Sequence, residues 1–517
     1  MGRLFYWQII QGPSLYLKAI SQTLKPEKVN PIRGTIYDSN NYPLAFSSRY
    51  FQLSLYKPNL KKDLTNIINE INSTHPNLSQ KDQNLLSKFK DNSDQKWITL
   101  SDLFSYTDTK NLTDPGISYV EIDKRLYPEE NLARSLLGYL TTNNDGTTRG
   151  ISGLESFYQK QLAGKTGYLW STKDATGKTI INKRSWQDSV QNGIDLHTSI
   201  NRSIQHLVEK TLKEGVINFQ ADSGSISLME PNTGQIIAMA NFQNIATASA
   251  TKIIPIADLF EPGSIFKPLV VTMALDSNSI NTDFVCTKCN SSRTIGQYTI
   301  TNWDNELHPN SSLQDIIKNS DNIGMSYVID QLGLKSFLKY FSKLNLDSKS
   351  NIDLPGESYP LSKNYWPDID FATASFGQGF AVNQIQMLSA FNSLATGGTY
   401  HPPRIAKSTK IDSSIIFKTE TVNKIKDILQ YSVENGAVAK LRPKGLKVCA
   451  KSGTAQVSVQ GSYVESGTIA SYIGFSPCLN PKFTMIVTIN NPKSSPWGSS
   501  TAAPIWYDLA EKISYLL

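Results

Sequence analysis

One stretch near the middle of this 517-residue chain decides the fold, and it reads Glu261-Pro262-Gly263-Ser264-Ile265-Phe266-Lys267-Pro268. If a helix begins at Ser264, then Ser264 and Lys267 lie about one turn apart on the same face. An amine close to a hydroxyl is one way to build an activated nucleophile. Because Pro268 has no N–H, it is tolerated only near the start of a helix. The stretch therefore predicts that Ser264 stands at the tip of a helix.

The Ser-x-x-Lys spacing is weak evidence on its own. Ser87 and Lys90 have the same spacing, as do Ser336 and Lys339. Since serine and lysine are abundant here, an unsupported pair of this kind usually marks a solvated helix face. Ser264 needs support from other parts of the chain.

The composition is that of a globular protein with more than one domain. A chain of 517 residues predicts two or three domains. The formal net charge of +7 is modest for this length. The sequence lacks a dense Lys/Arg patch with interleaved aromatic residues, which argues against nucleic acid as a partner. A mildly basic surface is compatible with anionic membranes or cell-wall polymers.

The cysteines and histidines give no metal-site pattern, and four cysteines do not make a disulfide framework in a chain this long. Cys286-Thr-Lys-Cys289 supplies two thiols, whereas a structural zinc site usually needs four ligands. We expect a local disulfide or two free thiols there, and no metal or cofactor. Cys449 would share a strand face with Lys451, two residues on. We interpret it as a small buried residue rather than a reactive thiol.

The N-terminal region has no run of about 20 apolar residues, so we expect no transmembrane helix in this chain. Residues 4–10 (Leu4-Phe5-Tyr6-Trp7-Gln8-Ile9-Ile10) are apolar and aromatic but too short to span a bilayer. They are typical either of the aromatic edge of a membrane segment or of a short amphipathic helix packed on a domain. We expect residues 1–30 to form a helical stalk ending near Pro31.

The first half of the chain shows no catalytic constellation and is interpreted as a scaffold. Turn residues and apolar patterns predict strands at 33–38, 50–55 and 117–122, short helices at 132–139 and 153–162, and a hairpin within 164–183. Residues 58–95 predict a surface helix followed by a polar, mobile segment.

A second domain is predicted from about residue 196. After a helix around residues 204–212, strands at 225–230 and 235–241 flank the turn Asn232-Thr233-Gly234. Residues 260–345 are predicted to be mostly helical. Strands at 446–451, 469–475 and 483–490 precede a final helix at 502–517. The pattern predicts an α+β fold, an antiparallel sheet flanked by helices.

Two further polar clusters follow Ser264 in order, and they are Ser320-Asp321-Asn322 and Lys451-Ser452-Gly453-Thr454. The first lies in a predicted break between helices, where it could simply be a helix cap. The second lies at the end of a predicted strand, where Ser-Gly-Thr is common turn chemistry. Penicillin-binding proteins and class A β-lactamases carry Ser-x-x-Lys, Ser-Asp-Asn and Lys-Thr-Gly in this order. Ser452 replaces the threonine and keeps the hydroxyl. The sequence resembles a class B penicillin-binding protein, a monofunctional DD-transpeptidase.

The resemblance extends over nearly the whole chain. The family's N-terminal motifs resemble Arg33-Gly34-Thr35-Ile36-Tyr37-Asp38, Arg125-Leu126-Tyr127-Pro128 with Gly138-Tyr139, and Gly153-Leu154-Glu155. Phe376-Gly377-Gln378-Gly379 with Gln384-Ile385-Gln386 resembles the division-specific branch more than the elongation branch. The resemblance implies a stalk at 1–30 after a membrane anchor that was trimmed or is absent, an elongated pedestal (dimerisation-like) domain at 31–195, and a transpeptidase domain at 196–517 with the penicillin-binding/serine β-lactamase-like fold.

The resemblance also implies roles for the site residues. Ser264 would attack the stem peptide, with Lys267 as base. Only about one lysine in a few thousand is neutral at pH 7 when its pKa has the ordinary value of about 10.4. Burial or a second cation, for which Lys451 is the evident candidate, would lower that pKa. Ser320 would pass a proton, and Asn322 would bind the substrate amide.

Substrate binding is assigned by the same resemblance to Asp321, Ser452, Gly453, Thr454 and Gln456. The backbone N–H groups of Ser264 and Thr454 would form an oxyanion hole. The implied partners are peptidoglycan stem peptides ending in D-Ala-D-Ala, β-lactams, a membrane glycan polymerase of the shape, elongation and division type, and other division proteins. The implied location is the inner membrane, with the catalytic domain on the periplasmic side.

Two other functions share some of these features. A serine β-lactamase or a β-lactam sensor carries the same three polar clusters, but the long N-terminal half is not typical of a secreted lactamase. A non-catalytic division scaffold could keep the fold, but all three clusters are intact. We therefore expect a septal peptidoglycan D,D-transpeptidase that β-lactams inhibit covalently.

Overall fold

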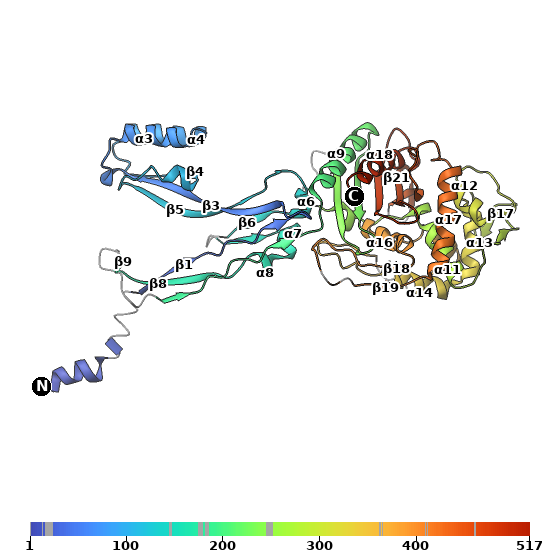
Figure 1. Cartoon of the computed structure of the whole chain (residues 1–517), viewed down its shortest axis with the longest axis horizontal. Helices are drawn as coiled ribbons and strands as arrows, with labels where there is room; N and C mark the ends of the chain where they lie inside the picture. Colours follow the sequence, from blue (N-terminus) through green and yellow to red (C-terminus); the bar gives the residue numbers. More distant parts are fainter. Residues whose placement is uncertain are drawn as a thin grey trace.

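The computed structural model describes residues 2–12, 14–15, 24–143, 147–173, 179–180, 186–244, 252–360, 363, 365–408, 410, 412–459 and 462–517. The molecule is elongated, with a C-terminal lobe (α9 to α18, residues 202–514) at one end and a pedestal (β1 to β11, residues 24–197) at the other. The pedestal divides into two arms (Figure 1). The upper arm holds β3, β4, β5, α3, α4 and α5 (residues 43–126), and the lower arm holds β1, β8, β9 and β10.

The N-terminal region differs from the predicted helical stalk. Helix α1 (Gly2–Phe5) and the π-helical turn η1 (Tyr6–Ile10) are helical and exposed, and residues 16–23 lie outside the described residues. Leu24–Val29, however, form strand β1, which pairs antiparallel with β8 (Gly167–Lys173). Pro26 lies in this strand, which is at the edge of its sheet, where a missing N–H is tolerated. In the described part of the chain, no helix is long and apolar enough to cross a membrane.

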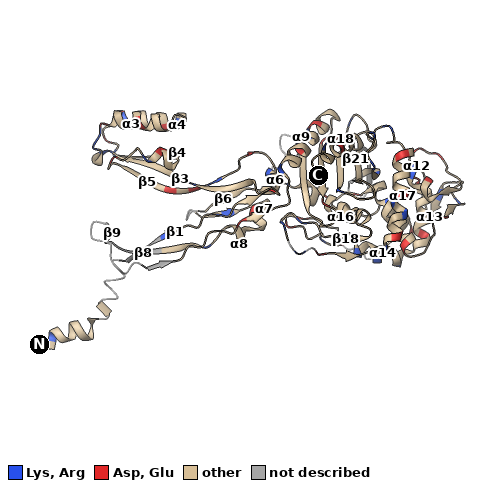
Figure 2. Ribbon diagram, in the orientation of Figure 1, with Lys and Arg blue, Asp and Glu red and all other residues tan. Residues whose placement is uncertain are grey.

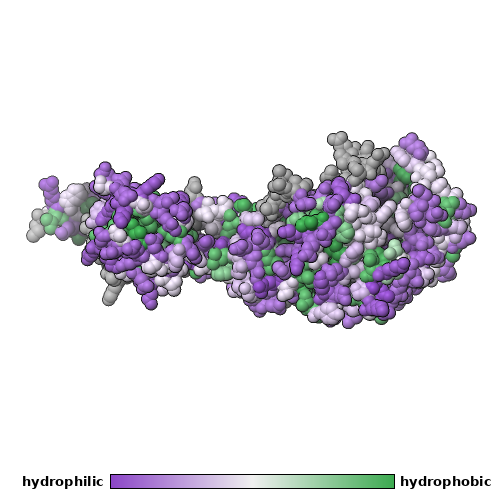
Figure 3. Space-filling view, turned by 90° about the horizontal axis from the view of Figure 1, so that it is seen from above, coloured by the Kyte–Doolittle hydropathy of each residue, from purple (hydrophilic) through white to green (hydrophobic). Residues whose placement is uncertain are grey.

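The upper arm is a twisted sheet covered by two helices. Strand β3 (Pro43–Tyr56) pairs with both β4 (Trp97–Phe104) and β5 (Ile117–Leu126). Helices α3 (Leu64–Thr74) and α4 (Gln80–Asp91) cover one face. The prediction of a mobile polar segment after a single helix was wrong. The segment contains α4, which Ser79 caps and which buries Leu86 and Phe89. Hydrophilic side chains cover much of the surface at this end of the molecule (Figure 3).

A buried ion cluster joins the three N-terminal motifs. Glu155, at 0% exposure, accepts hydrogen bonds from Arg33 Nε at 2.6 Å and from Arg125 Nε at 2.8 Å. Glu155 belongs to α7 (Gly153–Phe157), which is separated from α8 (Gln159–Leu162), so the predicted helix at 153–162 is two short helices. Residues more than 100 positions apart are thereby held together at the base of the two arms.

The C-terminal lobe is built on a five-stranded antiparallel sheet. Its order is β13 (Ile236–Gln243), β12 (Ser223–Met229), β22 (Phe483–Asn490), β21 (Ser462–Ser476) and β20 (Cys449–Val459). Helices α9 (Arg202–Asn218) and α18 (Ala502–Ser514) pack on one face, and α16 (Gln384–Ala395) packs on the other. Because neighbouring strand residues point to opposite faces, Ile486 and Val487 belong to different cores.

The predicted α+β lobe is confirmed, with two local differences. Strand β20 begins at Cys449 and continues to Val459, so Lys451-Ser452-Gly453-Thr454 lies inside the strand rather than at its end. The region 260–345 contains four short strands between Val285 and Ser312 in addition to its helices. The described part of β20 is an edge strand of the sheet and leaves one side open.

The pedestal and the C-terminal lobe share one hydrophobic core, which includes Ile36 and Leu136 from the former and Met229 from the latter. Polar contacts cross the same junction. The Asp353 carboxylate accepts hydrogen bonds from the Tyr158 hydroxyl and from two backbone N–H groups of the lobe, all at 2.7 Å. The pedestal and the C-terminal lobe are therefore joined by both apolar packing and hydrogen bonds.

Candidate active site

Ser264 lies on a tight turn at the start of a buried helix. The 3-10 turn η3 (Gly263–Phe266) leads into α11 (Lys267–Asp276), and Pro268 occupies the first turn, as predicted. The backbone N–H of Gly263 donates to the Gly377 carbonyl at 2.9 Å. A Cβ at Gly377, where φ is +78°, would lie 2.2 Å from the Gly263 carbonyl oxygen. The Phe376–Gly379 motif thus supports the turn that presents Ser264.

Lys267 is fully buried, at 0% exposure. Its Nζ donates to the Ser320 carbonyl at 2.5 Å, the Ser320 hydroxyl at 3.1 Å and Asn322 Oδ1 at 2.7 Å. Burial is the main cause that lowers the pKa of Lys267 well below its usual value, and the nearby charge of Lys451 lowers it further. Burial and the charge of Lys451 were both expected from the sequence to lower this pKa, and burial is the larger cause.

Ser320 lies between two lysines. It links α12 (Leu313–Asn319) to α13 (Asn322–Leu332) and adopts the left-handed conformation, with φ of +55°. That conformation is unfavourable for a residue with a Cβ and typically marks a functional constraint. Lys451 Nζ donates to the Ser320 hydroxyl at 3.2 Å. Burial lowers the pKa of Lys451 to about 8.

Asn322 is held by groups that the sequence did not indicate. Its Nδ2 donates to the Thr301 carbonyl at 3.1 Å, while its Oδ1 accepts from Lys267. Its backbone N–H donates to Asn302 Oδ1 at 2.8 Å. Asn302 is 3% exposed and lies in a turn-rich stretch, where an asparagine looks like any other loop residue. Each end of the Asn322 amide is therefore already bonded once within the protein.

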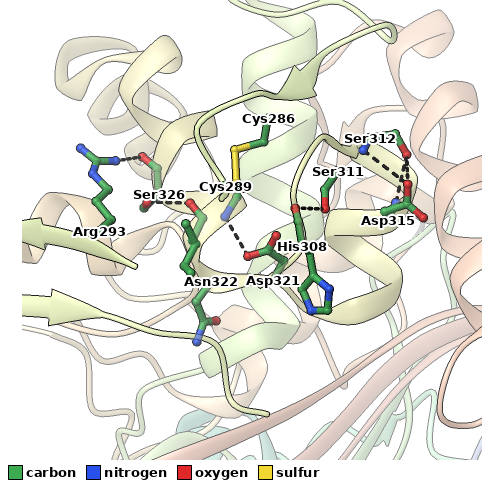
Figure 4. The surroundings of a disulfide bond; sticks show 12 residues. Cys286, Cys289, Arg293, His308, Ser311, Ser312, Asp315, Asp321, Asn322 and Ser326 are labelled. Carbon is green, nitrogen blue, oxygen red and sulfur yellow. Dashed lines mark hydrogen bonds between the residues drawn. A yellow bond between two sulfur atoms is a disulfide. The ribbon is translucent and has the colours of Figure 1, made fainter. Parts of the chain in front are cut away.

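Asp321 does not line the site, although substrate binding was expected of it. The side chain is 0% exposed, and its Oδ1 accepts from the Gly324 N–H at 2.9 Å, capping α13. Figure 4 shows the Asp321 and Asn322 side chains pointing in different directions from the same loop. The Asp321 charge raises the pKa of Lys267, against the larger lowering by burial. Its position supports an electrostatic and structural role.

One cysteine interpretation agrees with the structure, and the interpretation of Cys449 needs correction. Cys286 and Cys289 form a disulfide, one of the two expected alternatives, which lies beside the Ser320–Asn322 loop (Figure 4). Cys449 is not an unpaired buried residue, because it is bonded to Cys478. Cys478 follows β21, the antiparallel neighbour of β20, so the strand pairing brings together two cysteines whose separation of 29 residues gives no local signal.

The open edge of β20 and the Ser264 turn form the walls of one cavity of about 440 Å³. Its lining includes Ser264, Ser320, Asn322, Lys451, Ser452, Gly453 and Thr454. A Cβ at Gly453 would lie 2.8 Å from Ile265 Cγ2, so this glycine allows β20 to approach the turn closely. Gln456 is exposed and lies outside this cavity. It lines a neighbouring cavity of about 920 Å³, which shares Asn322 with the first.

Two tryptophans at the cavity were missed from the sequence. The rings of Trp303 and Trp497 meet edge to face, with centroids 5.2 Å apart, and are 53% and 40% exposed. Trp303 Nε1 donates to the Asn319 carbonyl at 3.1 Å, which ties its ring to the end of α12. Exposed aromatic rings at a cavity favour contact with apolar parts of a ligand. The two residues are 194 positions apart, and no sequence pattern links them.

The arrangement fits acyl transfer through a serine. A hydroxyl on a tight turn, a buried amine with a lowered pKa and a second hydroxyl shared by two amines are the parts of an activated nucleophile. The strand edge adds the hydroxyls of Ser452 and Thr454. Within the described ranges, no group of three or more His, Cys, Asp and Glu side chains could hold a metal ion.

Comparisons with known proteins agree with this geometry. Residues 224–511 match the Penicillin binding protein transpeptidase domain, and residues 28–198 match the Penicillin-binding Protein dimerisation domain. The chain is 28% identical over 540 residues to Peptidoglycan D,D-transpeptidase FtsI of Escherichia coli (strain K12), covering 98% of this chain and 87% of that protein. It is 27% identical over 422 residues to Stage V sporulation protein D of Bacillus subtilis (strain 168), covering 77% of this chain and 64% of that protein.

The fold is shared with solved structures of the same kind. The crystal structure of Penicillin Binding Protein 2X from Streptococcus thermophilus superposes with a TM-score of 0.80 at 20% identity, covering 95% of this chain and 80% of that chain. At this identity the likeness concerns the fold alone. The family match spans more than half of the chain and includes all three polar clusters. The chain therefore belongs to the class B penicillin-binding proteins, in which a transpeptidase domain follows a dimerisation domain.

Proposed function

We propose that this protein is a peptidoglycan D,D-transpeptidase that cross-links stem peptides through a serine acyl-enzyme and that β-lactams acylate. The observation that carries the proposal is the convergence of Ser264, Ser320 and Lys451 at one cavity, with the buried Lys267 amine hydrogen-bonded to the Ser320 hydroxyl. FtsI of Escherichia coli is named a peptidoglycan D,D-transpeptidase, and the present chain aligns with it over nearly its whole length.

In the acylation step, Ser264 Oγ attacks the carbonyl carbon of the penultimate D-Ala and its proton passes to neutral Lys267. The C–N bond to the terminal D-Ala breaks, and the leaving amine takes a proton through the Ser320 hydroxyl, which contacts both lysines. An amine of a second stem peptide then attacks the ester, and the proton transfers run in reverse. The products are the cross-linked peptide and free Ser264.

Substrate is oriented by the edge of β20. The terminal carboxylate lies near the Ser452 and Thr454 hydroxyls, where the Lys451 charge stabilises it. The backbone N–H groups of Ser264 and Thr454 are proposed to hold the oxyanion, and loss of one such donor typically costs about 3 kcal/mol of barrier lowering. Gln456 contributes from the neighbouring cavity, and Asp321 acts through Lys267 and α13 rather than by contact.

The cellular role is proposed from the relatives. Those named FtsI, together with the Phe376–Gly379 motif, favour septal synthesis over elongation. A membrane glycan polymerase of the shape, elongation and division type would supply the glycan strands, with other division proteins as partners. The proposed location is the inner membrane, with the C-terminal lobe on the periplasmic side.

The decisive experiment compares the wild type with Ser264→Ala in labelling by a fluorescent penicillin. We expect labelling to disappear while the melting temperature stays the same, and undiminished labelling would refute Ser264 as the nucleophile. Ser336→Ala, in the unrelated Ser-x-x-Lys of α14 (Leu334–Lys343), is the matched control and should label normally. The lifetime of the wild-type adduct separates the alternatives, since a β-lactamase would lose the label by rapid hydrolysis.

A further inference from the structure

A second polar cavity lies in the pedestal, where the two arms meet. Its volume is about 250 Å³, and we call it the fork cavity. The lining comes from both arms and from the segments between them: Asn30, Pro31, Arg33, Ser47, Asp123, Arg125, Leu140, Asn143, Thr147, Thr148, Arg149, Gln159, Ala163, Gly164 and Thr166. Figure 2 shows basic ribbon segments beside β6 (Leu140–Thr142), close to this place.

Arg125 lines the fork cavity and carries one donor that the described residues leave unpaired. Its side chain is 5% exposed, its Nε donates to Glu155, and its Nη1 donates to the Gly34 carbonyl and the Ser47 hydroxyl. Its Nη2 is buried and has no hydrogen-bond partner among the residues that the structure describes. Buried polar groups are nearly always paired, and an ionised donor is especially costly to leave unpaired. The unused Nη2 therefore points to a ligand that supplies an acceptor.

The charge balance of the fork cavity favours an anion. Among the described residues, three arginines (Arg33, Arg125 and Arg149) and one carboxylate (Asp123) line it, and Glu155 lies next to Arg33 and Arg125. Both oxygens of Glu155 are used by Arg33 and Arg125, and Asp123 pairs with Arg49 at 3.6 Å. Arg149 is exposed and forms no ion pair with the described residues. A planar guanidinium pairs best with a carboxylate or phosphate oxygen, in a charge-assisted hydrogen bond.

Asn30 brings an unpaired acceptor to the same cavity, so the ligand should also supply a hydrogen-bond donor. Its Oδ1 is buried and has no donor among the described residues. An acceptor of this kind is satisfied by an N–H group, which a carboxylate alone does not supply. A peptide that carries a carboxylate side chain has both groups within a few bonds of each other. A volume of about 250 Å³, against about 30 Å³ for one water, has room for a single acidic residue.

We propose that the fork cavity binds one acidic residue of a peptide segment, with its carboxylate between Arg125 and Arg149 and a backbone N–H on Asn30. Such a ligand would contact the strands of the upper arm, the β6–β7 hairpin (Leu140–Thr142 and Thr148–Gly150) and the start of the lower arm together. The site is separate from the cavity at Ser264, so it does not depend on the proposed transpeptidase function.

The test is a titration of the purified full chain, followed by isothermal calorimetry, with N-acetyl-aspartate amide and with N-acetyl-asparagine amide. The two probes differ in their charge and not in their shape. We expect saturable binding of the aspartate probe and at least tenfold weaker binding of the asparagine probe. Equal binding of the two, or no binding of the aspartate probe, would overturn the proposal.

Two single substitutions test whether the probe binds in the fork cavity. Arg149→Ala changes an exposed side chain, so the fold is retained, and it should weaken the aspartate probe at least tenfold. Lys124→Ala removes the same charge from the residue next to Arg125, on the other face of β5, and should leave affinity within twofold. Equal effects of the two variants would mean that only net charge matters and would refute the site.

Malonate tests the role of Asn30, because it carries carboxylates and no N–H. Weaker binding of malonate than of the aspartate probe supports a peptide ligand, and equal or tighter binding contradicts it. Labelling of Ser264 by fluorescent penicillin should be unchanged in Arg149→Ala, so a failure at the fork cavity is distinguishable from a failure of the proposed enzyme.

Discussion

Replacing Lys451 by methionine tests how Lys267 becomes a base. The substitution keeps a long side chain in a buried position, at 4% exposure, and removes its charge. Lys267 Nζ lies 3.1 Å and Lys451 Nζ 3.2 Å from the same Ser320 hydroxyl. The two nitrogens are therefore close, and their repulsion is part of what lowers the pKa of Lys267. Without Lys451 that pKa must rise.

The expected size of this change in pKa follows from the distance between the two amines. Two unit charges at most about 6 Å apart, in an effective dielectric constant of about 20, repel by at least about 3 kcal/mol. That energy corresponds to a change of about two units in the pH at which Lys267 loses its proton. Burial remains as the larger cause, so the pKa of Lys267 should stay below that of a lysine in water. Since the pKa of Lys451 is itself about 8, its charge is largely present at neutral pH.

The assay is the second-order rate of acylation by a fluorescent penicillin as a function of pH. A base works when it is neutral, so the rate rises with pH through the pKa of Lys267 in the free enzyme. We expect the midpoint of this rise to move to higher pH in Lys451→Met, by about two units. Lys451→Arg keeps the charge and should keep the midpoint near its wild-type position. A midpoint that stays in place or moves to lower pH in Lys451→Met would refute the reasoning.

Two further changes test the pedestal and the nucleophile turn. Glu155→Gln leaves the buried charges of Arg33 and Arg125 without a counter-ion, and we expect a loss of about 3–5 kcal/mol of unfolding free energy in urea; the exposed Glu121→Gln should change it by less than about 1 kcal/mol. Gly377→Ala places a Cβ 2.2 Å from the carbonyl oxygen of the nucleophile turn, and we expect acylation to slow by about a hundredfold with the fold retained. Unchanged values in either case would contradict the contacts described.

Local patterns predicted what depends on local chemistry. The helix start at Ser264 followed from Pro268, and the hairpin at 232–234 followed from Asn-Thr-Gly between apolar runs. Strand β1 could not be predicted in this way, because its partner β8 lies about 140 residues further along the chain. Helix α4 was missed because only two apolar residues in a polar segment anchor it.

In the candidate site too, the sequence revealed the residues that are close together in the chain and missed those that only tertiary folding brings together. The three polar clusters were visible because each is contiguous in the chain. Asn302, Trp303 and Trp497 are brought to the site by tertiary folding, and each stands in a stretch whose composition is that of an ordinary loop. Gly453 belongs to one of these visible clusters, but the group that excludes a Cβ there is Ile265, which lies on another element.

The hydrogen bonds at Lys267 support its proposed role as the base. A lysine ammonium has three N–H donors and no acceptor. The two oxygens of Ser320 and the Asn322 side chain take hydrogen bonds from Lys267 Nζ, so the protonated amine has no group left for Ser264. Loss of one proton leaves two donors and exposes a lone pair. These acceptors favour the charged amine, while burial and Lys451 oppose it. In the proposed mechanism these contacts hold the amine in place in both states, and loss of one proton frees a lone pair that can accept from the Ser264 hydroxyl.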